Sequence, residues 1–207
     1  MEQLPKRKRT RLPDYDYSAP GAYFITVCTQ GRKCILSEIV AGGAVPCGET
    51  GAHRPVGAIH ESPAVQLTQA GLCVQRAVER LAEQYTNLRV EKYVIMPNHV
   101  HLLLEITEDR AVRERPLRSK RERSLVDKAI GFMKMNSSRL IHISSPNSNI
   151  WQRSYHDHII RGEDDYREIW NYIDTNPARW CEDCFYPNPH GRFTNRPQGQ
   201  CKSAGRS

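Results

Sequence analysis

The chain of 207 residues contains no apolar run approaching the ~18 residues that a membrane-spanning helix needs. Its first residues are charged and include no apolar stretch of the kind found in secretory signals. Apolar residues make up only 39 % of the chain, so part of its length is expected to be loop or tail. The sequence therefore predicts a cytoplasmic protein with no membrane segment and with one domain that has a real core.

A recognisable cysteine framework is also missing. The seven cysteines are an odd number with scattered spacing. Cys181 and Cys184 form one C-x-x-C pair, but no second pair follows at the distance of a zinc site. Because thiols stay reduced in the cytoplasm, we expect free cysteines and no structural zinc.

Basic residues outnumber acidic ones by 30 to 23, which gives a net charge of +7. Many of them gather in two clusters, at 6–11 and 110–123. Such clusters favour binding to the phosphate backbone of a nucleic acid, although solvated loops can carry them as well. Charge alone does not distinguish DNA from RNA.

The hydrophobic pattern predicts the order strand, helix, strand, strand, helix, strand, helix. Thr68 and Ser124 are placed to cap two of the helices, and Pro177 must end the third near Asn176. This order favours an α+β fold, a ferredoxin-like antiparallel sheet with helices packed on one face. The predicted strands are 22–29, 88–96, 99–106 and 150–160, and the predicted helices are 69–85, 125–140 and 163–176.

Composition divides the chain into an arm, a domain and a tail. The predicted segments are a basic N-terminal arm at 1–20, the domain at 21–180, a flexible loop at about 38–63, a basic loop at about 108–123 and a disordered tail at 181–207.

The stretch Met96–Leu104, MPNHVHLLL, carries two histidines two positions apart within a predicted strand. Side chains at i and i+2 lie on the same face of a strand, so His99 and His101 are expected to point side by side. Neutral imidazole is the commonest metal ligand. The pair is therefore either half of a metal site or a polar patch on the sheet.

Tyr172 and Asn176 lie four residues apart on the last predicted helix and therefore share a face. The amide oxygen of Asn176, added to His99 and His101, would give a mixed N/O ligand set. Such a set suits Mg²⁺ or Mn²⁺ and does not exclude Zn²⁺. Tyr172 would then be a nucleophile for phosphorus, with His156, His158 or Lys128 as candidate activating groups. Alternatively, Tyr172 is a half-buried helix residue that packs against the sheet.

Four motifs occur in a fixed order: YDYSAPGAYFIT at 15–26, MPNHVH at 96–101, IWQRSYHDHIIR at 150–161 and NYIDTNP at 171–177. In these motifs the chain resembles the REP-associated tyrosine transposases, relatives of the insertion-sequence single-strand transposases with an HUH motif. The resemblance spans about residues 14–180. The 38–63 loop is longer than the family core requires, and no family motif falls in the tail.

The resemblance implies an enzyme that cleaves and rejoins single-stranded DNA containing REP-like hairpins. Its histidine pair, His99 and His101, would bind a divalent metal, Mg²⁺ or Mn²⁺, with Asn176 as the third ligand. Tyr172 would form a 5′-phosphotyrosine and free a 3′-hydroxyl. The protein would be a monomer or a homodimer. The residues expected to hold the DNA are Lys6, Arg7, Lys8, Arg9, Arg11, Arg32, Lys33, Arg118, Lys120, Arg121, Arg123, Lys128, Arg153, His158 and Arg161.

Two other functions agree with the same residues. One is a domesticated DNA-binding regulator without catalysis, which would need no metal. The other is a metal-dependent nuclease that uses activated water, with Tyr172 in a structural role. The presence of His99, His101, Tyr172 and Asn176 together argues against the regulator.

Overall fold

The computed structural model describes residues 15–40, 64–108, 123–146, 149–183 and 185–186. Their centre is a four-stranded antiparallel sheet in the order β4-β5-β1-β6. The strands are β1 (Gly21–Cys28), β4 (Leu88–Ile95), β5 (His99–Ile106) and β6 (His156–Ile159). This strand order is that of the ferredoxin-like template, so the predicted α+β class is confirmed.

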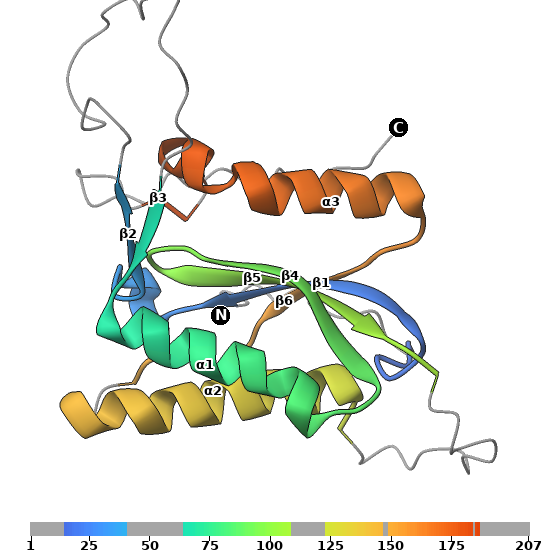
Figure 1. Ribbon diagram of the computed structural model, residues 1–207, viewed down its shortest axis with the longest axis horizontal. Helices are drawn as coiled ribbons and strands as arrows, with labels where there is room; N and C mark the ends of the chain where they lie inside the picture. The colour runs from blue at the N-terminus through green and yellow to red at the C-terminus, as the bar shows by residue number, and fades with distance from the viewer. Residues whose placement is uncertain (1–14, 41–63, 109–122, 147–148, 184, 187–207) are drawn as a thin grey trace, which may run out of the picture.

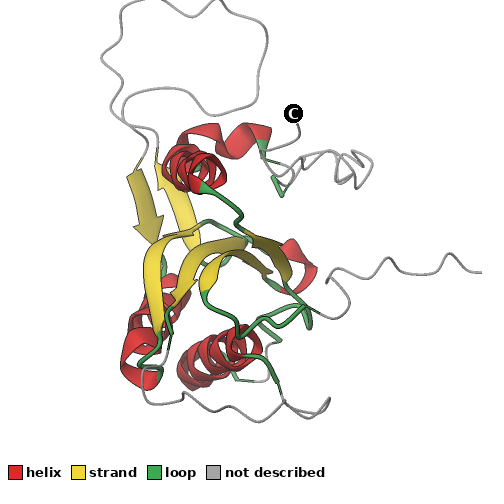
Figure 2. Cartoon of the chain, turned by 90° about the vertical axis from the view of Figure 1, so that its right-hand side faces the viewer, coloured by secondary structure: helices red, strands yellow, loops and turns green. Residues whose placement is uncertain are grey.

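Three long helices cover the sheet (Figures 1 and 2). Helices α1 (Gln69–Gln84) and α2 (Leu125–Ser144) pack side by side on one face, whereas α3 (Glu163–Thr175) lies across the other. The predicted caps are confirmed, because Thr68 accepts a hydrogen bond from Gly71 N and Ser124 accepts one from Asp127 N. The expectation that the helices pack on one face holds for α1 and α2 and is wrong for α3.

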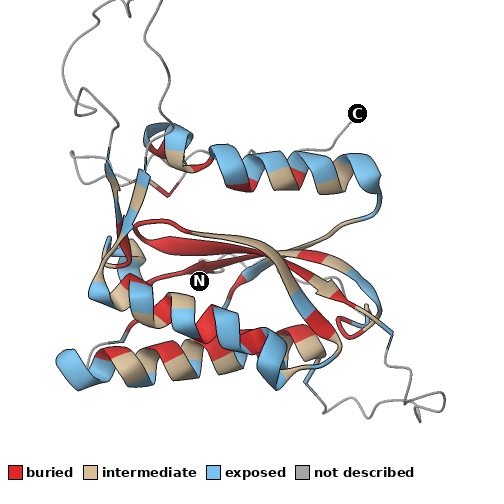
Figure 3. Cartoon of the chain, in the orientation of Figure 1, coloured by how far each residue is buried: buried red, intermediate tan, exposed pale blue. Residues whose placement is uncertain are grey.

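The burial of β5 explains why both faces carry helices. Seven of its eight residues are buried, so the strand offers apolar side chains in both directions (Figure 3). Val100, Leu102 and Leu104 belong to the large core shared with α1 and α2. Leu103 points the opposite way and packs against Ile169 and Ile173 of α3. A strand that is apolar on both faces requires cover on both.

The region after β1 departs from the predicted boundaries. A short helical turn, η1 (Gln30–Arg32), is followed by a hairpin of β2 (Ser37–Val40) and β3 (Ala64–Leu67). Residues 38–40, expected to belong to a loop, are instead part of β2, because the apolar Ile39 and Val40 pair with β3. The rest of that loop, at 41–63, lies outside the described residues.

The strand predicted at 150–160 is shorter than expected, since β6 covers only four residues. Trp151 forms an isolated bridge with Thr29. The next carbonyls, of Gln152 and Ser154, accept hydrogen bonds from Lys134 Nζ of α2. The segment at 152–154, between Trp151 and β6, is therefore held by the Lys134 side chain and not by strand pairing.

The predicted tail begins too early. A second helical turn, η2 (Pro177–Glu182), follows α3, and Trp180 and Phe185 are buried in a cluster with Cys28 and Met96. Burial of these aromatic side chains holds the segment against the sheet. The Pro- and Asn-rich composition did not predict this packing. Residues 187–207 lie outside the described part, as do the arm at 1–14 and the basic segment at 109–122.

Cysteine pairing also departs from expectation at one position. Cys181 is disulfide-bonded, so the prediction of free thiols is wrong there, whereas Cys28, Cys34 and Cys73 are free. The cellular compartment, which was the basis of the prediction, does not fix the state of an individual thiol. No helix among the described residues is both long and apolar enough to span a membrane.

Candidate metal centre and nucleophile

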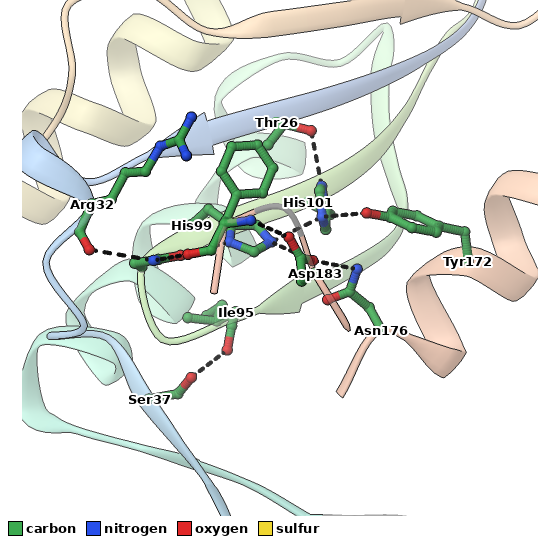
Figure 4. A network of polar contacts seen from close by, with 11 residues as sticks. Thr26, Arg32, Ser37, Ile95, His99, His101, Tyr172, Asn176 and Asp183 are labelled. Atoms are coloured by element: carbon green, nitrogen blue, oxygen red, sulfur yellow. Dashed lines mark hydrogen bonds and ion pairs between the residues drawn. The ribbon is translucent and has the colours of Figure 1, made fainter. Parts of the chain in front are cut away.

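The histidine pair lies at the start of β5, directly after the turn that joins β4 to β5. Met96 N donates to His99 O across this turn at 2.9 Å. Both imidazoles are buried on the α3 face of the sheet, as the spacing predicts, and their Nε2 atoms are 3.0 Å apart (Figure 4). The two rings therefore converge on one point.

Each imidazole has a hydrogen-bond partner on its other nitrogen. His99 Nδ1 lies 2.9 Å from Asn98 Oδ1, and His101 Nδ1 lies 2.9 Å from Thr26 Oγ1. Both oxygens can accept a hydrogen bond from Nδ1–H, an arrangement that directs the Nε2 lone pair toward a shared ligand.

Burial keeps both rings neutral. It lowers the pKa of His101 to about 3. It is also the main cause that holds the pKa of His99 well below its usual range, with smaller contributions from His101 and the positive charge of Arg32. Neutral imidazole is the form that binds metals.

The surrounding oxygens fit a cation. Asp183 Oδ2 lies 3.9 Å from His99 Nε2, and one ligand atom each from His99, His101 and Asp183 fall within 4.8 Å of one another. Asn176 Nδ2 donates to Asp183 Oδ2 at 3.3 Å, while Asn176 Oδ1 is buried without a hydrogen-bond partner among the described residues. With both Nδ1 atoms protonated, the two Nε2 lone pairs would face each other at 3.0 Å, and a metal ion would satisfy them. The buried Asn176 Oδ1, which lacks a partner among the described residues, is a further candidate ligand.

Tyr172 stands beside this group. Its Oη is 3.5 Å from His101 Nε2, and its ring meets those of Phe24 and His101 edge-on. The packing of Ile169 and Ile173 against the sheet fixes this part of α3. The tyrosine as a whole remains 38 % exposed, so it lies at the boundary between the buried histidines and solvent. The structure thus brings together all four residues proposed for the site: His99, His101, Tyr172 and Asn176.

Sequence reasoning missed Asp183 and the residues that support the histidines. Asp183 falls in the segment taken for a tail, whose aromatic residues were the available signal of packing. The rings of Trp180 and Phe185 lie 5.9 and 4.7 Å from that of His99. Asn98 Nδ2 donates to Phe185 O at 2.7 Å and so joins this segment to the turn before β5.

The residues predicted to hold DNA do not form one group. Arg32 is close to the centre, since its guanidinium lies 4.8 Å from the centroid of the Phe185 ring. Its φ of +54° is rare for a residue with a side chain, and Asn98 Nδ2 donates to its carbonyl at 3.3 Å. Lys33, Arg123, Arg153 and Arg161 are exposed.

Two other predicted residues are placed differently. Lys128 lies on α2, on the far side of the sheet, so the suggestion that it activates Tyr172 is wrong. His158 Nε2 lies 2.9 and 3.0 Å from the two carboxylate oxygens of Asp165. The remaining predicted DNA contacts lie outside the described residues: Lys6, Arg7, Lys8, Arg9, Arg11, Arg118, Lys120 and Arg121.

No protein-family model matches the chain. An uncharacterized protein of Haemophilus influenzae is 28 % identical over 188 residues, which cover 87 % of this chain and 93 % of that protein. Two solved structures are similar at 16 % identity. One is a REP-associated tyrosine transposase bound to a REP hairpin (TM-score 0.49, 86 % of this chain and 74 % of that one). The other is a candidate transposase of Deinococcus radiodurans (TM-score 0.39, covering 83 % of this chain and 97 % of that one).

Proposed function

We propose that this chain is a metal-dependent, transposase-like DNA strand transferase that cleaves and rejoins single-stranded DNA through Tyr172. One observation carries the proposal: the hydroxyl of a partly exposed tyrosine lies 3.5 Å from a buried, neutral histidine of a group that can hold a metal. The order of the four sequence motifs supports the same conclusion.

His99 and His101 would hold a divalent cation, Mg²⁺ or Mn²⁺, together with an oxygen of Asn176 or Asp183. When bound, the ion would polarise the scissile phosphate and offset the charge that develops on it. Asn98 and Thr26 would keep both imidazoles in the ligand tautomer.

Tyr172 Oη would attack the phosphorus, forming the P–Oη bond while the P–O3′ bond breaks. The products are a 5′-phosphotyrosine and a DNA strand that ends in a 3′-hydroxyl. A second 3′-hydroxyl can attack the phosphotyrosine and release the enzyme, which completes strand transfer without an external energy source.

Surface charge favours one path for the DNA. Acidic side chains occupy much of the solvent side of α3, so a phosphate backbone is repelled there. Tyr172 instead contacts Phe24 of β1. On that side of α3 we place the strand, near Arg32, with the exposed Lys33, Arg153 and Arg161 as further candidate contacts. Hairpin-containing DNA of the REP type is the proposed substrate, in line with the family resemblance.

The decisive experiment looks for the covalent intermediate. The protein and Mn²⁺ are incubated with single-stranded oligonucleotides that cover its own gene and flanking DNA, including any hairpins, and are then analysed on a denaturing gel. A 5′-phosphotyrosine retains the fragment on the 3′ side of the cut. We therefore expect a 3′-end label, and not a 5′-end label, to migrate with the protein.

Tyr172→Phe should abolish this adduct, whereas Tyr166→Phe on the same helix should leave it intact. Tyr166 is a suitable control because its ring stacks on Trp170, away from the histidines. Cleavage that persists in Tyr172→Phe without an adduct would instead identify a nuclease that uses water. Metal-independent binding with no cleavage by the wild type would identify a DNA-binding regulator.

A further inference from the structure

The strand β6 carries a histidine that lies on the face of the sheet occupied by the candidate site. Thr26 of β1 pairs with His101 on one side and with His156 on the other. Directly paired residues of antiparallel strands point to the same face. Because Thr26 Oγ1 lies 2.9 Å from His101 Nδ1, that shared face is the one covered by α3. His101, Thr26 and His156 therefore form one row across three strands.

We propose that His156 is the group that takes the proton from Tyr172 during attack on the phosphate. This inference rests on the proposed function and adds to it the residue that makes the tyrosine nucleophilic. Uncatalysed, a neutral phenol is a weak nucleophile near pH 7, so a base must act on it.

The path of the chain sets Tyr172 level with this row. After β6 the chain reverses, and Asp165 of α3 bonds to His158 of β6. Tyr172 lies seven residues further along the helix, or about 10 Å at 1.5 Å per residue. That length equals about three residues of strand. Counted back from His158, it ends at Tyr155, one residue beyond His156.

The contacts of Tyr172 give the same position independently. Its ring touches Phe24, which pairs with His158, and its hydroxyl reaches His101, which pairs with Thr26. The hydroxyl is therefore over the Thr26 row, with His101 on one flank and His156 on the other. His156 is exposed, so no burial restrains its ring. The proposal places that ring next to the hydroxyl, in contact with it directly or through one water.

Other candidate bases are engaged elsewhere. His158 lies against both oxygens of Asp165, and Lys134 Nζ is held by the carbonyls of Gln152 and Ser154 on the α2 side. The Nε2 atom of His101 is directed at His99. Asp157 pairs with Ile25 and so belongs to the opposite face.

The proton balance closes. As the P–Oη bond forms, the phenolic proton passes to a ring nitrogen of His156, which becomes imidazolium. The P–O3′ bond breaks with its electron pair on O3′, which takes a proton from water. The imidazolium then neutralises the hydroxide left behind. In rejoining, the steps run in reverse and His156 returns the proton to Oη.

The test measures the rate of adduct formation by His156→Ala with Mn²⁺ and the cleaved oligonucleotide. We expect the rate of adduct formation to fall about 100-fold or more, the range typical of a removed general base. The affinity for single-stranded DNA, measured in the presence of a chelator, should change by less than about threefold. Added imidazole should restore part of the rate. His142→Ala, which removes an exposed histidine from α2 on the far side of the sheet, should match the wild type. His156→Asn should repeat the loss, and its melting temperature checks that the fold is intact.

A substrate with sulfur in place of the scissile O3′ separates two roles. A thiolate leaves without a proton, so a base that serves Tyr172 remains necessary and the defect of His156→Ala should persist. A defect that disappears on this substrate would assign His156 to the leaving group and overturn the inference. So would an unchanged rate on the ordinary substrate, or a loss explained by DNA affinity alone. If the wild type itself forms no adduct, it is the proposed function that fails.

Discussion

At the scale of single residues, Asn98 joins three separate parts of the site through one side chain. Its Oδ1 lies against His99 Nδ1, while its Nδ2 donates to the carbonyls of Phe185 and Arg32. The side chain is fully buried. One amide thus fixes the tautomer of a candidate ligand and two segments that are far apart in the sequence.

Asn98→Ala should therefore weaken metal binding although Asn98 is not proposed as a ligand. We expect Mn²⁺ affinity to fall about 10- to 100-fold, the usual cost of removing a partner that orients a metal-bound histidine. Titration calorimetry with Mn²⁺ measures this. Asn136→Ala is the matched control, because Asn136 donates to Phe132 O within α2. Equal affinities in the two variants would contradict the role of Asn98.

Four residues of the site could be predicted from the sequence because their spacing places them on one face of a strand or of a helix. Two positions on a strand and four on a helix each define a face, so His99 with His101, and Tyr172 with Asn176, could be paired without a structure. Asp183 has no such neighbour. Its approach to His99 depends on the burial of Trp180 and Phe185, which is a property of the folded chain.

At the scale of elements, α3 determines whether the site exists. The histidines belong to β5, whereas Tyr172 belongs to α3 and Asn176 follows directly after it. The two parts meet through the packing of Ile169 and Ile173 against Leu103. The helical pattern predicted α3 itself. It could not predict the face, because that choice depends on β5 being apolar on both sides.

Ile173→Ala should loosen this contact. Removing a buried isoleucine side chain costs about 2–5 kcal/mol, and here the cost falls on the docking of α3. We expect faster amide hydrogen exchange in α3 than in α1, together with slower adduct formation. Ile143→Ala on α2 is the control, since Ile143 is 77 % exposed. Unchanged exchange in α3 would mean that other contacts hold the helix.

At the scale of the whole molecule, the buried histidine pair links stability to pH. In the folded, ion-free protein burial keeps His101 neutral down to about pH 3, and His99 is shifted in the same direction. In the unfolded chain both rings take up protons below about pH 6.5. The unfolded state then binds more protons, so the free energy of unfolding decreases as the pH falls below that value.

His101→Gln should reduce this dependence. Each neutral buried histidine contributes a slope of up to about 1.4 kcal/mol per pH unit below pH 6.5. Urea unfolding in chelator at pH 7, 6 and 5 gives the slopes of wild type and variant. Per pH unit of acidification, we expect the free energy of unfolding of the variant to fall by up to about 1.4 kcal/mol less than that of the wild type. Parallel curves would show that His101 titrates alike in the folded and unfolded states.

The division of the site between β5 and the segment from α3 to η2 also orders events during synthesis. The histidines leave the ribosome long before Tyr172, Asn176 and Asp183, since the whole of α2 and β6 lies between them. A nascent chain, or one cut short by a premature stop codon after β5, therefore carries the two imidazoles without the proposed nucleophile, Tyr172. Under the proposed function, such a chain would not cleave DNA, and strand cleavage would begin only once α3 and η2 have been synthesised.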